Sequence, residues 1–181
     1  MEMYDIMGTE LVVLRLKEQL YQNESMSNQE SNTDQQNVVP DEVIIPHDCR
    51  EAIIKIMKPT FTLPNGVVMN SRNQIIKAVS VIDLTTNVQV AMMMAVVMEV
   101  KAIRPGTKCI DFIRALIGIG VLKYSDEKAI KNMADGMNRK LHGSQKKDKK
   151  VPPLPPKHLQ WTGTDRNIGD AIYKAMTTKD V

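Results

Sequence analysis

Aromatic residues are scarce in this sequence. Two Phe, four Tyr and one Trp make up 4% of the 181 residues. Hydrophobic residues nevertheless account for 43%, so a core of this chain has to be built from aliphatic side chains and from its 13 Met. Methionine adapts its shape to irregular gaps, which favours a methionine-rich core over a methionine-lined surface. The scarcity also excludes a row of aromatic rings on which the bases of single-stranded nucleic acid stack.

Cysteine is almost absent as well. Cys49 and Cys109 lie far apart, which excludes a disulfide framework and the paired spacing of zinc ligands. The sequence therefore predicts no metal site, and it indicates a reducing compartment, either cytoplasmic or nuclear. His47, Asp48 and Cys49 are adjacent, but neighbouring residues rarely converge on one reacting atom, and Asp48 with Glu51 has the spacing of a helix capping box. We expect no catalytic site and no cofactor, and hence a non-enzymatic protein.

Long hydrophobic runs are missing. The longest apolar run, Val90 to Met98, has nine residues, whereas a helix that crosses a bilayer needs about 20. Glu2 and Asp5 occupy the place where a secretory signal peptide carries positive charge. We therefore expect an intracellular protein without a transmembrane segment.

The charge is unevenly distributed, although its net value is only +3. Residues 1–58 hold 11 Asp and Glu against 5 Lys and Arg, and residues 59–181 hold 19 Lys and Arg against 10 Asp and Glu. An acidic front and a basic back favour contact with a polyanion, such as nucleic acid or an acidic protein, or contact between copies of the chain. The alternative is a chance unevenness on a solvated surface.

The first 41 residues divide into a helical and a polar part. Residues 1–21 are expected to form an amphipathic helix, in which Val13, Leu16 and Leu20 follow the heptad spacing of a coiled-coil seam. This seam either docks on the rest of the protein or pairs with another copy in a homo-oligomer. Residues 22–41 are rich in Asn, Gln, Ser and acid, which predicts a disordered linker. Within this linker, an acid follows three residues after each of Ser27 and Ser31, the spacing that suits phosphorylation by an acidophilic kinase.

Residues 42–143 are expected to form a helical core domain. Its one hairpin signal, near residues 61–69, is the turn sequence Pro64-Asn65-Gly66 between two short apolar runs. Four helices joined by short loops indicate a compact all-α bundle. Apolar periodicity, caps and Gly or Pro stops predict these helices over about 71–84, 88–103, 107–117 and 125–141.

The segment from Val90 to Met98 has no polar face. A helix that is apolar all round lies in the centre of a bundle or inside an oligomer. For an oligomer, Met92 and Val96 are the predicted self-association contacts, together with the N-terminal seam. The sequence leaves both places open, because periodicity describes the faces of a helix and not what covers them.

A basic and proline-rich stretch, residues 144–160, is expected to link the core to a C-terminal helix and tail, residues 161–181. Cations gather at its start and at the end of the preceding helix, and such a run contacts phosphates without reading sequence. The predicted polyanion-binding residues are Arg139, Lys140, Lys146, Lys147, Lys149 and Lys150. The alternative is a linker that its charge merely keeps solvated.

The same linker carries a polyproline motif. In a polyproline II helix with three residues per turn, Pro152 and Pro155 lie on one edge. Leu154 and Lys157 complete the predicted docking site for a polyproline-binding domain. The alternative is a stiff spacer that holds the last helix away from the bundle.

These patterns combine into a mainly α protein, a compact helical bundle with one small β-hairpin, an acidic disordered arm before it and a basic, proline-rich linker with a terminal helix after it. We expect a non-enzymatic, self-associating structural or assembly protein that contacts nucleic acid or another polyanion. Its design is analogous to that of small viral matrix- or nucleocapsid-associated proteins, without a shared motif. The alternative is an intracellular adaptor or regulatory protein that docks a polyproline-reading partner through Pro152–Lys157.

Overall fold

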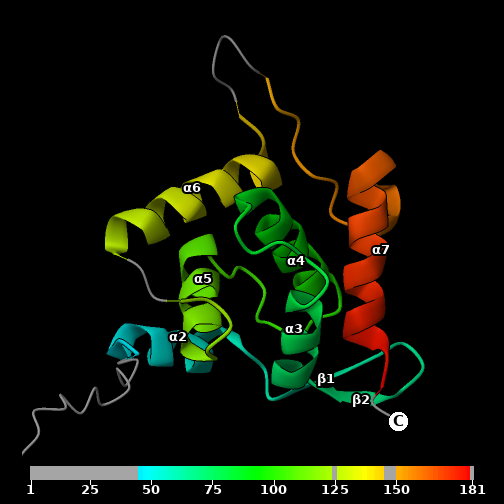
Figure 1. The fold of residues 1–181 in the computed structure, drawn as a ribbon. Helices are drawn as coiled ribbons and strands as arrows, with labels where there is room; N and C mark the ends of the chain where they lie inside the picture. Colours follow the sequence, from blue (N-terminus) through cyan, green and yellow to red (C-terminus); the bar gives the residue numbers. More distant parts are fainter. Residues whose placement is uncertain (1–44, 124–125, 145–149, 180–181) are drawn as a thin grey trace, which may run out of the picture. The chain divides into compact units, whose positions relative to one another are not determined.

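A computed structural model describes residues 45–123, 126–144 and 150–179. Within these ranges the chain is mainly helical, which confirms the expected fold class (Figure 1). The elements, in chain order, are α2 (His47–Ile56), β1 (Thr60–Thr62), β2 (Val68–Asn70), α3 (Ser71–Val79), α4 (Asn87–Glu99), α5 (Cys109–Gly118), α6 (Glu127–His142), the short 3₁₀ helix η1 (His158–Gln160) and α7 (Gly163–Thr177). None of the described helices combines the length and the hydrophobicity needed to cross a membrane. The predicted N-terminal helix and linker lie outside the described residues, and with them Val13, Leu16, Leu20, Ser27 and Ser31.

The predicted hairpin forms at the expected place. β1 and β2 are antiparallel, with Phe61 opposite Met69 at the centre of the pair. Both of these side chains are buried, while the flanking residues of each strand are exposed. In the turn, Gly66 adopts a φ of +83°, which glycine tolerates because it has no Cβ. The Asn65 side chain stabilises the turn further by accepting a hydrogen bond from the Val67 N–H at 3.2 Å.

α4 is the central helix of the bundle. Every residue from Val90 to Val97 is buried, because α3, α5, α6 and α7 all pack against this helix (Figure 1). The sequence leaves open whether an all-apolar helix lies in the centre of a bundle or inside an oligomer. In the structure, α4 lies in the centre of the bundle. Met92 and Val96 are 0% exposed within one chain, so the structure gives no support to their assignment as self-association contacts, which stays a prediction. Neighbouring helices of the same chain already remove these side chains from water.

α2 packs along α5, and the two helices approach closely at Gly118. A Cβ atom at this position would overlap the backbone carbonyl oxygen of Cys49 and press on the Ile53 side chain. As the sequence predicts, α5 ends at Gly118, and Gly120 follows with a φ of +81°. The structure shows a second role for Gly118, because the missing side chain allows the two helices to come into contact.

α6 forms almost where the sequence predicts it. Asp126 caps its start by accepting a hydrogen bond from the Ala129 N–H at 2.7 Å. Gly143 ends it with a φ of +78°. The helix packs against α4 and α5. At Gly136 it meets the side chain of Asn87, whose amide a Cβ atom would overlap.

Two helices end earlier than the sequence predicts. α3 ends at Val79 instead of near residue 84. The Asp83 carboxylate accepts hydrogen bonds from the Thr85 N–H at 2.9 Å and from the Thr85 hydroxyl at 2.6 Å, and this local turn competes with the helix. α4 ends at Glu99 instead of near residue 103, because the chain reverses at Lys101, which has a φ of +64°.

Residues 150–161, here called the strap, return the chain from α6 to the bundle. Val151 pairs with Ser144 in an antiparallel bridge, and the Leu154 N–H donates to the Lys140 carbonyl at 3.1 Å. After the strap, α7 packs against α3 and α4 and belongs to the same compact unit as the other described helices (Figure 1). The interpretation of this segment as a spacer that holds the last helix away from the bundle is therefore wrong.

The close approach of α2 and α5 predicts the effect of one methyl group. We expect Gly118→Ala to lower the free energy of unfolding by about 1–3 kcal/mol, because the helices must separate to relieve an overlap with a backbone oxygen. Gly136→Ala is the matched control, since its overlap is with the Asn87 side chain, which can rotate away at a smaller cost. Urea denaturation of both variants measures the difference. A more stable Gly118→Ala, as helix propensity alone favours, would contradict the close crossing.

Candidate functional site

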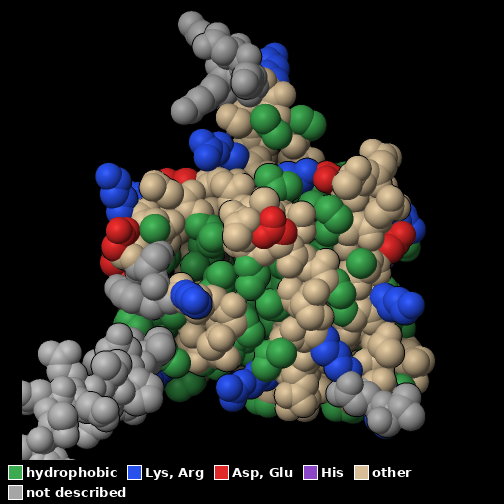
Figure 2. All heavy atoms as spheres, in the orientation of Figure 1, with side chains coloured by type: hydrophobic (Ala, Val, Ile, Leu, Met, Phe, Trp, Pro, Cys, Tyr) green, Lys and Arg blue, Asp and Glu red, His purple; other side chains and the backbone are tan. Residues whose placement is uncertain are grey.

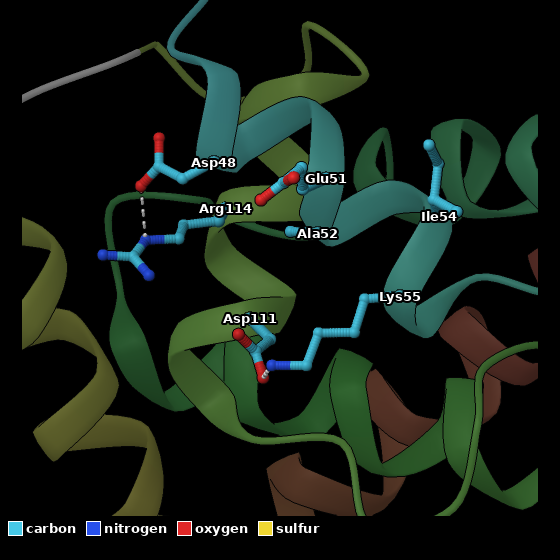
Figure 3. Close-up of a pocket in the computed structure, with 7 residues that line it drawn as sticks. All are labelled: Asp48, Glu51, Ala52, Ile54, Lys55, Asp111 and Arg114. Carbon is cyan, nitrogen blue, oxygen red and sulfur yellow. Dashed lines mark hydrogen bonds and ion pairs between the residues drawn. The ribbon is translucent and has the colours of Figure 1, made fainter.

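A hollow between α2 and α5 gathers five charged side chains (Figure 3). Its volume is about 410 Å³. Figure 3 shows Asp48 and Arg114 side by side, and Lys55 reaching Asp111 at a separate point. Ile54 points away from both pairs and is 77% exposed. The lining consists of Asp48, Glu51, Ala52, Ile54, Lys55, Asp111 and Arg114.

Ion pairs engage both cations of this hollow. Arg114 Nε lies 3.1 Å from Asp48 Oδ2, and Arg114 Nη2 donates to Glu127 Oε2 at 2.9 Å. Lys55 Nζ donates to Asp111 Oδ2 at 2.8 Å. The predicted capping box at Asp48 does not form, because α2 has no side-chain cap and the carboxylate turns to Arg114 instead. The Asp48–Arg114 and Lys55–Asp111 pairs join α2 to α5, and the Arg114–Glu127 pair joins α5 to α6.

Both cysteines are buried, and burial raises the pKa of each thiol. For Cys49, the negative charge of Asp48 raises the pKa further. For Cys109, the pKa rises to about 11, and Sγ donates a hydrogen bond to Asn138 Oδ1 at 3.1 Å. Only the thiolate is a strong nucleophile, so at neutral pH both side chains behave as small buried hydrophobic groups.

A larger groove lies between the start of α5 and the side of α6. Its volume is about 660 Å³, which falls in the range of ligand-binding clefts. The apolar part of its lining is formed by Met98, Cys109, Ile110 and Ala134. The polar part is formed by Thr107, Lys108, Lys131, Asp135, Asn138 and His142, besides the backbone at Gly106. Among the described residues, this lining therefore holds one carboxylate against two lysines, an excess of positive charge that favours an anionic ligand.

The predicted polyanion-binding residues differ in what they contact. Lys140 Nζ pairs with Asp165 of α7, so this lysine links two helices and its charge is partly compensated. Arg139 and Lys150 are exposed. The other predicted positions, Lys146, Lys147 and Lys149, lie outside the described residues. Of the six residues, the structure therefore shows two with an exposed positive charge.

Part of the polyproline motif packs against the rest of the protein. Leu154 and Pro155 are half-buried, and the Trp161 indole N–H donates to the Pro155 carbonyl at 2.8 Å. Pro152 and Lys157 are exposed. Pro152 and Pro155 both line a hollow that extends to Trp161, and the half-buried Pro155 is the less exposed of the two prolines. Docking of a polyproline-binding domain here stays a prediction.

A buried histidine joins the strap to α4 and α7. His158 is 3% exposed, and its backbone N–H and ring Nδ1 lie 3.0 and 2.8 Å from the same oxygen, Glu99 Oε2. Its ring stacks on Tyr173 with the ring centroids 4.4 Å apart, and Nε2 lies 3.6 Å from Asp170 Oδ1. The sequence places His158 in a linker. No local pattern could have found this cluster, because Glu99 precedes His158 by 59 positions.

The Glu99–His158 contact predicts that removal of the Glu99 carboxylate lowers the stability of the protein. We expect Glu99→Ala to lower the free energy of unfolding by about 2–4 kcal/mol, because it leaves two buried donors of His158 unpaired. Glu51→Ala is the matched control, since Glu51 also lies near a histidine, His47, but both side chains are exposed and 3.8 Å apart. Its effect should be close to zero. Urea denaturation at pH 7 separates the two results, and equal effects would contradict a structural role of the buried contact.

The Cys109 thiol predicts a loss of stability at alkaline pH. Its pKa is about 11 in the folded protein and 9.0 when unperturbed, so between these values the unfolded chain releases a proton that the folded protein keeps. Stability should therefore be unaffected by this group below pH 9 and fall as the pH rises towards 11, by up to about 2–3 kcal/mol. Urea denaturation from pH 8 to 11 should show a steeper decline for the unmodified protein than for Cys109→Ala. Parallel curves would contradict the raised pKa.

The α5–α6 groove is the better candidate for a binding site. Both cations of the α2–α5 hollow are taken up by ion pairs, whereas Lys108 and Lys131 meet no carboxylate within ion-pair distance in the described parts of the chain. In residues 45–123, 126–144 and 150–179, no three His, Cys, Asp or Glu side chains gather in a way that could hold a metal ion. Comparisons with protein-family models, with curated proteins and with solved structures find no match for this chain.

Proposed function

We propose that this protein is a non-enzymatic binding protein that contacts a polyanion through its basic segments, with nucleic acid as the expected polyanion. The observation that carries this proposal is the imbalance of charge among the described residues, which hold 19 Lys and Arg against 10 Asp and Glu. Five of these carboxylates pair with Lys or Arg, and only four cations take part in these pairs. These pairs leave an excess of positive charge among the described residues, and such an excess attracts phosphates.

The described Lys, Arg and aromatic side chains limit which contacts with a nucleic acid are open to the folded part. Lys and Arg side chains are scattered over the face that Figure 2 presents and do not gather in one patch. The described aromatic residues offer no ring for stacking bases, because Phe61, Phe112 and Trp161 are buried and the Tyr173 ring stacks on His158. Contacts of this kind bind phosphates without reading base sequence, and they weaken as salt rises.

Self-association stays a prediction, and fewer residues support it once the fold is known. α4 gives it no support, since its apolar side chains are covered within one chain. What remains is the heptad seam of Val13, Leu16 and Leu20, outside the described residues. The adaptor alternative also has less support, because Leu154 and Pro155 of its docking motif pack against the protein itself.

The proposal predicts that the affinity for a polyanion falls as salt rises. It also predicts that this affinity depends on the basic run of Lys146, Lys147, Lys149 and Lys150. We expect fluorescently labelled oligothymidine to bind the full chain at low salt, as measured by fluorescence anisotropy. Unlabelled heparin should also bind, as measured by its competition with the labelled oligothymidine. Replacement of Lys146, Lys147, Lys149 and Lys150 by Gln should weaken binding and flatten the dependence of log K on log salt. For single-stranded DNA the slope should fall by about 0.7 for each phosphate that the variant no longer neutralises.

A second variant with the same charge serves as its control. Lys123, Lys128, Lys174 and Lys179 are exposed and lie outside the basic run, so their replacement by Gln changes the net charge equally. Equal weakening in the two variants would mean that net charge alone drives binding and would remove the run from the site. Failure of the unmodified protein to bind either polyanion at low salt would reject the proposed function.

A further inference from the structure

We infer that the α5–α6 groove binds a short acidic segment of a partner protein that also carries apolar side chains. The inference is independent of the polyanion proposal, because it rests on the lining of one groove and not on the excess of charge over the whole surface. The groove has an apolar part, here called the floor, with Met98, Ile110 and Ala134, and a basic part, here called the rim, with Lys108 and Lys131. A partner has to match both parts.

The shape of the groove suits a peptide. Its α6 wall is one stripe of the helix, since Lys131, Asp135, Asn138 and His142 follow one another at three or four positions and Ala134 lies beside Asp135. At 1.5 Å per residue, a stripe of this extent is about 16 Å long. That length matches about five residues of an extended chain or three turns of a helix. A volume of about 660 Å³ over this length describes a groove for a chain segment better than a closed pocket.

The floor of the groove is apolar and incompletely covered. Met98 and Ile110 are only half-buried, and Ala134 on the α6 wall leaves room above it because its side chain is small. Covering such side chains with an apolar partner residue is favourable by about 25 cal/mol for each Å² of apolar surface removed from water. Methionine in particular adapts its rotamer to partners of different shape, a property of surfaces that bind hydrophobic peptide residues.

The rim selects the charge of the partner. Lys108 and Lys131 are exposed, and neither lies within ion-pair distance of a carboxylate in the described ranges. Asp135 is the only acidic residue among the described residues of the lining, against these two lysines. α5 begins directly after Lys108 without a side-chain cap, so the N–H groups of its first turn add to the positive potential at this end of the groove.

A peptide fits this combination better than a nucleic acid does. A sugar–phosphate backbone would meet the lysines but would leave Met98 and Ile110 in contact with water or with polar groups. Among the described residues that line the groove, none is aromatic, so these residues offer bases no ring on which to stack. Asp and Glu of a peptide can reach the lysine rim, while its Leu, Ile or Met side chains cover the floor.

The test uses the full chain and a defined peptide. The probe is a fluorescein-labelled peptide of Glu and Leu, and the reference probe carries Ser in place of every Leu. We expect the Leu-containing peptide to bind, and Lys108→Glu with Lys131→Glu to weaken its affinity about tenfold or more. The matched control is Lys123→Glu with Lys174→Glu, two exposed lysines outside the groove, which should change the affinity less than about threefold.

Methyl NMR of ¹³C-methionine-labelled protein locates the bound peptide. The Met98 signal, assigned with Met98→Leu, should shift on addition of the peptide, while the signals of the fully buried Met92 and Met176 should stay in place. Equal binding of the Ser-containing peptide, equal weakening by the two lysine pairs, or an unchanged Met98 signal would each overturn the inference. A Met98 shift caused by oligothymidine and not by the peptide would also overturn it. Oligothymidine binding that leaves Met98 unchanged would support the polyanion proposal alone, so the two proposals can fail separately.

Discussion

The burial of α4 is the constraint on which the rest of the structure depends. A helix with eight consecutive buried residues has no face that can meet water, so other elements must surround it completely. α3, α5, α6 and α7 do so, although they come from both sides of α4 in the sequence. Because the chain has few aromatic rings, this core is packed with Met, Val, Ile and Ala side chains, whose small or flexible shapes suit close helix crossings.

Because the other helices surround α4, most of the described charged residues lie on the outside of the bundle. Grooves form where the outer helices meet. Two of these grooves differ in how their charged side chains are paired. Between α2 and α5, ion pairs across the junction take up both cations and serve the packing that Gly118 permits. Between α5 and α6, two lysines border an apolar floor without carboxylate partners among the described residues, which is why this groove is the more promising surface for a ligand.

The strap shows how tertiary contacts change the meaning of a motif. Its proline-rich sequence has the features of a docking site, yet Leu154 and Pro155 face the bundle and Trp161 holds the Pro155 carbonyl. The contact of His158 with Glu99 then attaches the strap to the central helix, and α7 completes the cover of α4. The C-terminal segment is therefore a part of the core and contributes to stability, whatever partner its exposed residues contact.

The sequence by itself determined the helical class, the hairpin at Pro64-Asn65-Gly66, the approximate bounds of α6 and the apolar character of residues 90–98, of which 90–97 are buried. Each of these follows from interactions between residues a few positions apart, which periodicity and turn chemistry describe. Only the tertiary structure decided what covers Met92 and Val96, which face of the strap is free, that His158 meets Glu99, and that Lys108 and Lys131 border one groove. These contacts join residues far apart in the chain, and they depend on how the helices pack around α4, which no local pattern specifies.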